Sequence, residues 1–149
     1  MFRNTSKPLT REEIETMESE SGITLPDSFV EHYLVYNGGI PSRPYFYSEE
    51  EDVETEIQIF SPIKYGFDNL NLRTIEQKYA LFKEKSALMS RYLPFANDHG
   101  ANPICINLDN GEVSIVYMDN GELDQASFQF LAEDFAAFLD GLSEESIDD

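Results

Sequence analysis

Three short apolar segments in the second half of the chain constrain the fold more than any other feature of the sequence. They cover residues 92–97, 103–108 and 112–118, and turn-forming residues separate them. Between the last two stands Asp109-Asn110-Gly111, and Asn and Gly tolerate the positive backbone angles of a tight two-residue hairpin turn. Short apolar segments joined in this way are typical of antiparallel strands. We therefore predict three neighbouring antiparallel strands here.

Two helices are predicted in the first third of the chain. Thr10 and Glu13 have the spacing of a capping box, and Gly22 can take the left-handed conformation that closes a helix. A second helix is predicted to begin at Pro26 and to end at the segment Asn37-Gly38-Gly39. The two together would form a helical hairpin.

Two further helices are predicted from apolar residues that recur at helical spacing. The first set is Leu72, Ile75, Tyr79 and Phe82. The second follows a predicted cap at Ser127 and consists of Phe128, Leu131, Phe135, Phe138, Leu139 and Leu142. Residues 43–48 and 56–61 are predicted strands. The predicted fold class is α+β, an antiparallel sheet of about five strands with helices packed against it, in the order ααββαβββα.

The length of 149 residues fits a single domain over residues 1–149, built around one core. We expect an ordered core over about residues 10–142 and an acidic, frayed tail over 143–149. No apolar run approaches the ~20 residues of a membrane-spanning helix, and the first residues lack the features of a signal peptide. A cytoplasmic protein is therefore expected.

The chain is strongly acidic. Its 29 Asp and Glu residues outnumber 10 Lys and Arg residues, which gives a formal net charge of −19 at pH 7. Residues 92–149 hold 13 of the acidic residues and none of the basic ones. Phosphate backbones and anionic lipid surfaces would repel such a chain, so we expect no binding to nucleic acid or membranes. The charge is explained either by solubility alone or by a basic protein partner.

Residues 49–56 form the densest run of charge, with six carboxylates among eight positions. Carboxylates this close together repel one another and cannot be buried, so the run predicts an exposed, mobile loop. We predict that these carboxylates, together with two tyrosines that precede them, contact a partner. The predicted partner-binding residues are Glu49, Glu50, Glu51, Asp52, Glu54, Glu56, Tyr45 and Tyr47.

Motifs for catalysis or metal binding are weak. Asp98 and His99 in a predicted turn could act as an acid–base pair, which keeps a hydrolase open as an alternative. Cys105 lies within a predicted strand and is interpreted as a buried thiol. The Asp-Asn-Gly-Glu segments at 109–112 and 119–122 lack the spacing of a calcium loop and are interpreted as turns. We predict a protein that is not an enzyme and that has no metal or cofactor.

Short motifs along most of the chain resemble the SUKH superfamily. Leu25-Pro26-Asp27-Ser28-Phe29 followed by Tyr36-Asn37-Gly38-Gly39 is similar to the superfamily's L-P-x-x-[YF] to N-G-G signature. Leu93-Pro94-Phe95-Ala96-Asn97-Asp98, with Gly100 and the strand at 104–108, is similar to a second motif of the superfamily. The resemblance covers residues 10–142. One departure is the absence of tryptophan, where this chain has Tyr117-Met118-Asp119.

The resemblance implies an α+β domain that in bacteria commonly serves as the immunity protein of a polymorphic or contact-dependent toxin system. Such proteins bind a cognate toxin, often a nuclease, and block it. An acidic chain suits this role, because a nuclease presents a basic cleft to its polyanionic substrate. The superfamily also includes the yeast Knr-type cell-wall regulators. A regulatory or scaffold protein-interaction domain without a toxin partner is therefore the alternative.

Overall fold

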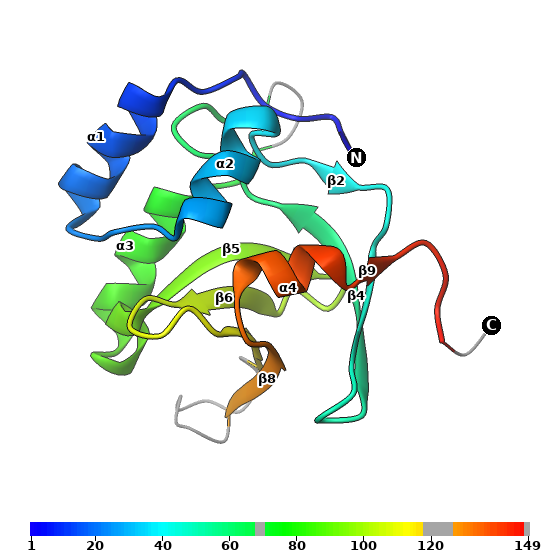
Figure 1. The fold of residues 1–149 in the computed structure, drawn as a ribbon. Coiled ribbons are helices and arrows are strands. Elements are labelled where there is room, and N and C mark those ends of the chain that lie inside the picture. Colours follow the sequence, from blue (N-terminus) through cyan, green and yellow to red (C-terminus); the bar gives the residue numbers. More distant parts are fainter. Residues whose placement is uncertain (68–70, 118–126, 148–149) are drawn as a thin grey trace.

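The computed structural model describes residues 1–67, 71–117 and 127–147. Four α-helices, a short 3₁₀ helix and nine strands are present in these ranges (Figure 1). The helices are α1 (Arg11–Ser21), α2 (Asp27–Val35), α3 (Ile75–Lys85) and α4 (Phe135–Asp140), with the 3₁₀ helix η1 at Leu88–Arg91. The strands are β1 (Phe2–Arg3), β2 (Ile40–Pro41), β3 (Tyr45–Ser48), β4 (Val53–Phe60), β5 (Tyr92–Asp98), β6 (Pro103–Asn107), β7 (Val113–Val116), β8 (Phe128–Ala132) and β9 (Leu142–Ser143).

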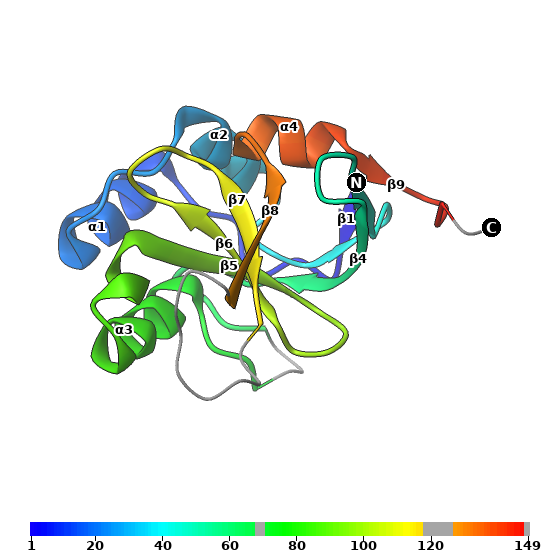
Figure 2. The ribbon, with the colours of Figure 1, turned by 90° about the horizontal axis from the view of Figure 1, so that it is seen from below.

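The main sheet has seven strands in the order β8-β7-β6-β5-β4-β3-β9, and every neighbouring pair is antiparallel. Strands β1 and β2 form a separate small sheet. Helices α2 and α4 lie over one face of the curled main sheet, and α3 lies on its other side, next to β5 (Figure 1, Figure 2). The predicted α+β class is confirmed. The sheet is larger than the five strands predicted, because β8 forms in a segment that was expected to be helix and β9 forms where that helix was expected to meet the tail.

The helices α1 and α2 follow from local signals. The Thr10 hydroxyl accepts a hydrogen bond from the Glu13 backbone N–H at 3.1 Å, and the Glu13 carboxylate accepts one from the Thr10 N–H at 2.9 Å. Gly22 closes α1 with a left-handed φ of 70°. Helix α2 begins directly after Pro26 and ends at Val35, just before the Asn37-Gly38-Gly39 segment. Both helix predictions are confirmed.

The Asn37-Gly38-Gly39 segment holds neighbouring parts of the backbone close together. The Asn37 side-chain amide donates to the backbone carbonyls of Lys7 and Ile63 at 2.9 and 3.0 Å. Its oxygen accepts from the Ile63 N–H at 2.7 Å, so one buried side chain joins three segments of backbone. At Gly38, where φ is +74°, a Cβ would lie 2.9 Å from a backbone oxygen of β4. Only glycine fits such a close approach without strain.

The three predicted strands of the second half are present as β5, β6 and β7. Leu93 pairs with Ile106, and Ile104 pairs with Ile115, so apolar side chains meet on the inner face of the sheet. The connection after β6 runs over residues 108–112 and includes Gly111 at a φ of +83°. It is therefore longer than the two-residue turn that we predicted, but it joins the predicted antiparallel pair.

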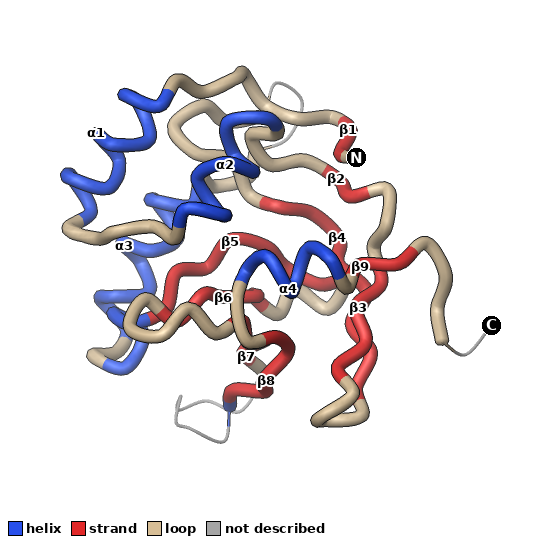
Figure 3. Tube along the Cα trace, viewed as in Figure 1, coloured by secondary structure: helices blue, strands red, loops and turns tan. Residues whose placement is uncertain are grey.

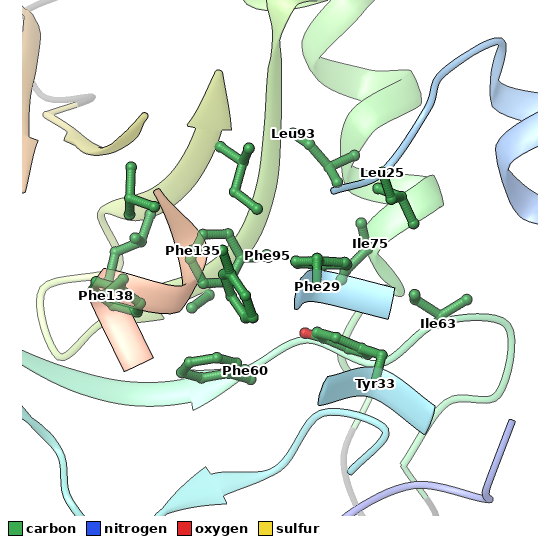
Figure 4. Close-up of a cluster of buried hydrophobic side chains, with 14 of the residues drawn as sticks. Leu25, Phe29, Tyr33, Phe60, Ile63, Ile75, Leu93, Phe95, Phe135 and Phe138 are labelled. Atoms are coloured by element: carbon green, nitrogen blue, oxygen red, sulfur yellow. The ribbon is translucent and has the colours of Figure 1, made fainter. Parts of the chain in front are cut away.

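Aromatic side chains dominate the core between the inner face of the sheet and helices α2 and α4 (Figure 4). Phe29 of α2 stacks on Tyr33 with ring centroids 4.5 Å apart, and Phe95 of β5 meets Phe135 of α4 at 5.3 Å. The buried Tyr33 hydroxyl donates to the Ser61 carbonyl at 2.8 Å, which satisfies its polar group. The resemblance residues Leu25 and Phe29 belong to this core as well.

The last predicted helix is wrong in its first half. Residues 128–132 form β8, which pairs with β7, and only the shorter α4 is helical. The side chain of Asp134 caps α4 by accepting from the Ala137 N–H at 2.7 Å, so the cap is not Ser127. Phe128 packs on Tyr92 with ring centroids 4.3 Å apart. An apolar spacing that fits a helix also fits a short strand, and the free edge of β7 decides between them.

Two other predictions need correction. Leu72 precedes α3 and is 43% exposed, whereas Ile75 and Tyr79 are buried as predicted. The run at residues 49–56 is not one loop, because β4 begins at Val53. The second Asp-Asn-Gly-Glu segment, at 119–122, lies outside the described residues.

Candidate partner-binding surface

The β3–β4 hairpin extends away from the rest of the molecule near one edge of the main sheet (Figure 1, Figure 3). In its register, Tyr45 pairs with Glu56 and Tyr47 pairs with Glu54. Side chains alternate between the two faces along a strand, so these four residues share the outer face of the hairpin. The opposite face is buried and carries Phe46, Ser48, Thr55 and Ile57. The hairpin is therefore firmly packed on one side and polar on the other.

The tip of the hairpin consists of residues 49–52, all of them acidic and exposed. Asp52 takes a left-handed φ of 51°, a conformation that Asp tolerates better than most residues. The Tyr47 hydroxyl donates to the Asp52 carboxylate at 2.6 Å, and this hydrogen bond raises the pKa of the hydroxyl. Tyr47 thus holds the tip against the outer face. Four of the six predicted carboxylates lie together at this tip.

Glu54 is engaged by the chain's own C-terminal segment. Its two carboxylate oxygens accept from the Ser146 hydroxyl at 2.5 Å and from the Ile147 backbone N–H at 2.7 Å. The segment reaches this position because β9 pairs with β3, with Ser143 opposite Tyr45. Residues 143–147, part of the tail that we expected to fray, thus contact the hairpin at Tyr45 and Glu54. Sequence reasoning missed the contact because its two sides are 92 and 93 residues apart.

Glu56 lies beside the exposed His99, with the imidazole Nε2 3.4 Å from the carboxylate. Asp98 faces another way: its carboxylate accepts from the backbone N–H groups of Gly100 and Asn102 at 2.9 and 2.8 Å. That contact closes the turn between β5 and β6. Asp98 and His99 do not meet, so the acid–base pair considered for a hydrolase is not assembled.

The remaining predicted candidates are structural. Cys105 is fully buried, as predicted, and burial raises the pKa of its thiol. Asn110, in the first Asp-Asn-Gly-Glu segment, accepts from the Glu112 N–H at 2.9 Å, as a turn residue does. In the part of the chain that the structure describes, no group of three or more His, Cys, Asp or Glu side chains is arranged to hold a metal ion. No helix of the described ranges combines the length and the apolar character that a membrane span requires.

A second polar cluster was not predicted from the sequence. The Glu13 carboxylate accepts from the Lys64 ammonium at 2.8 Å and from the Tyr65 hydroxyl. These contacts, the one with Lys64 first, lower the pKa of Glu13 from 4.5 to about 2. The Lys7 ammonium lies 4.6 Å from the centre of the Tyr65 ring. The cluster fastens the segment after β4 to the start of α1, and its only local signal was the capping box at Thr10.

The chain matches the family model described as SMI1 / KNR4 family (SUKH-1) over residues 8–141. A search of curated proteins found no match. The matched range contains both helices of the N-terminal third, the hairpin and six of the seven strands of the main sheet. Its extent and the motifs described above lead to one conclusion: the chain belongs to the SMI1/KNR4 family, SUKH-1.

Proposed function

We propose that this protein is an immunity protein, which binds a cognate bacterial toxin and neutralises it by stoichiometric occlusion of the toxin's active site. The observation that carries the proposal is the extended hairpin, with four carboxylates at its tip and Tyr45 and Tyr47 on its outer face. Membership of the SUKH-1 family supports a role of this kind. The protein would act by binding, without turnover, and would meet its toxin in the cytoplasm.

The partner that best fits this surface is a basic protein such as a nuclease. A formal net charge of −19 would attract a cationic cleft over long range and raise the association rate by roughly 10- to 1,000-fold at low salt. Attraction of this kind fades as ionic strength rises. Affinity would come from side chains that are buried on binding, and tyrosines are common among such anchors. Tyr45 and Tyr47 share a face of the hairpin with Glu54 and Glu56 and would serve as such anchors.

The decisive experiment is co-expression with the product of a toxin gene next to this one. Rescue of growth, and capture of the toxin with the protein, are the expected results. The tip is tested by the variant Glu49→Gln, Glu50→Gln, Glu51→Gln and Asp52→Asn, which should slow association about tenfold or more and flatten its salt dependence.

A matched control distinguishes the effect of the charges at the hairpin tip from the effect of the total charge of the protein on association. Four exposed helical glutamates carry the same total charge as the tip: Glu15, Glu20, Glu31 and Glu84. Replacing them with glutamine should slow association much less than the tip variant does. If both variants slow association equally, the hairpin has no special part in binding.

A regulatory or scaffold role of the Knr type, without a toxin partner, is the second candidate. The family description, SMI1 / KNR4 family (SUKH-1), supports this candidate because it names KNR4. The two candidates differ in one inexpensive observation. A toxin reading frame beside the gene supports immunity, and an isolated gene whose product captures signalling or cell-wall proteins supports regulation.

A further inference from the structure

We propose that residues 143–147 form a strap over the outer face of the hairpin, and that the strap occupies the position where Glu54 binds an arginine side chain of the partner. The inference rests on the proposed function, because it adds the chemistry of one contact to the same surface. Its basis is the way in which the strap meets Glu54.

The contact with Glu54 has the form of an arginine–carboxylate pair. One donor, the Ser146 hydroxyl, meets Oε1 at 2.5 Å, and a second donor, the Ile147 N–H, meets Oε2 at 2.7 Å. A guanidinium group offers two parallel N–H donors to the two oxygens of a carboxylate in the same way. A lysine ammonium is a single point of charge and does not match this geometry. The strap therefore satisfies Glu54 as a guanidinium would.

The chain is fixed up to the start of the strap. Leu142 is buried and pairs with Phe46 in the register of β9 and β3. Gly141 lies so close to the Phe46 ring that a Cβ there would be 2.6 Å from it. Release of the strap can therefore begin just after residue 143 and leave β9 and the core unchanged.

The strap is held by the pairing of Ser143 with Tyr45 at its start and by the contacts with Glu54 near its end. The Ser143 side chain is exposed, and its hydroxyl exchanges hydrogen bonds with the Glu145 backbone within the strap itself. Glu144 lies 4.0 Å from Arg43, and both side chains are largely exposed, so this pair contributes little. Ile147 is 55% exposed and is not an apolar anchor. Ordering five residues costs conformational entropy, so a ligand with better donors can displace the strap.

Such an arrangement makes the apparent affinity for a partner depend on the strap. A site that is open for only a fraction of the time binds its ligand more weakly by that fraction. If the strap covers Glu54 for about nine-tenths of the time, its removal strengthens binding about tenfold. A partner that presents arginine would overcome the strap, whereas one that presents only lysine would overcome it less well.

The test uses the full chain and two small probes, N-acetyl-arginine amide and N-acetyl-lysine amide, so it requires no toxin. Binding is followed by NMR through the backbone amide of residue 147, or through the hairpin amides where that amide is absent. Two variants act from opposite sides of the contact. Ser146→Ala with Ile147→Pro removes both donors of the strap, and Glu54→Gln removes the charged acceptor. Glu50→Gln, at the exposed tip, is the matched control for loss of one charge.

We expect the arginine probe to bind the strap variant about three to ten times more tightly than the original chain. It should bind the Glu54→Gln variant no better than the lysine probe does. Glu50→Gln should preserve the preference for arginine. Three results would overturn the proposal: no preference for the arginine probe, equal loss in the Glu54 and Glu50 variants, or no gain when the strap donors are removed. Each is independent of whether a toxin partner exists.

Discussion

Acid should destabilise this protein through His32, and the size of the effect follows from its surroundings. The imidazole lies on α2 between aromatic rings, with centroids 4.7 Å from Phe2, 5.6 Å from Phe135 and 5.8 Å from Phe60. Its Nε2 atom is buried and has no hydrogen-bond partner. Burial lowers the pKa of His32 from 6.5 to about 4. A proton would therefore place an uncompensated charge among apolar rings.

The protonation of His32 is linked to unfolding, and this linkage gives the change in the free energy of unfolding with pH. Between pH 6.5 and pH 4 the unfolded chain takes up a proton on His32 that the native protein does not, so the free energy of unfolding falls as the pH falls. Each unit of pKa difference corresponds to about 1.4 kcal/mol, which sets the full loss at about 3 kcal/mol. Between pH 7 and pH 5 the expected loss from this residue is about 2 kcal/mol.

The assay is urea unfolding of the original chain and of the His32→Gln variant at a series of pH values from 7.5 to 4.5. Carboxylates titrate in both proteins, so their contribution cancels in the difference between the two free energies. The free energy of unfolding of the original chain minus that of His32→Gln should fall by about 2 kcal/mol as the pH falls from 7 to 5. His99→Gln removes the exposed histidine and is the matched control. Parallel pH profiles for the original chain and His32→Gln would refute the reasoning.

Three further predictions concern stability and reactivity. Asn37→Ala should lower the free energy of unfolding by about 3 kcal/mol or more in urea, because the buried Ile63 N–H and its carbonyl lose their partner; a loss below 1 kcal/mol would contradict this. Gly38→Ala should destabilise by at least about 2 kcal/mol more than Gly111→Ala, since both have positive φ but only Gly38 approaches backbone atoms; equal melting temperatures for the two variants would disprove it. Cys105 should react with a thiol reagent only at the rate of unfolding, and rapid labelling of the native protein would show that it is not shielded.

The parts of the fold that the sequence predicts are those whose signals are local. The capping box at Thr10 and Glu13 lies within one helical turn, and the segment from Asn37 to Gly39 ends a helix by its own backbone preferences. Strands β5, β6 and β7 are consecutive and joined by short turns, so their pairing required no knowledge of the rest of the chain.

The parts that escaped prediction depend on distant partners. Residues 128–132 become a strand because they pair with the edge of β7, and their own sequence carries no signal of that pairing. The same is true of β9, which pairs with a strand almost a hundred residues earlier. In the candidate surface, the exposed tip could be predicted from charge density alone. The different surroundings of Glu54 and Glu56 could not, since a tail and a neighbouring turn determine them.

Helix α4 joins the two outermost strands of the main sheet, β8 and β9, which lie at opposite ends of the strand order. Both borders of the sheet are therefore completed by residues 128–143. During synthesis, a nascent chain that lacks residues 128–143 would leave one edge of β7 and one edge of β3 unpaired at the same time. Unpaired strand borders invite association with other chains. Residues 128–143 thus complete the domain, and a chain that terminates before them would expose two unpaired strand edges.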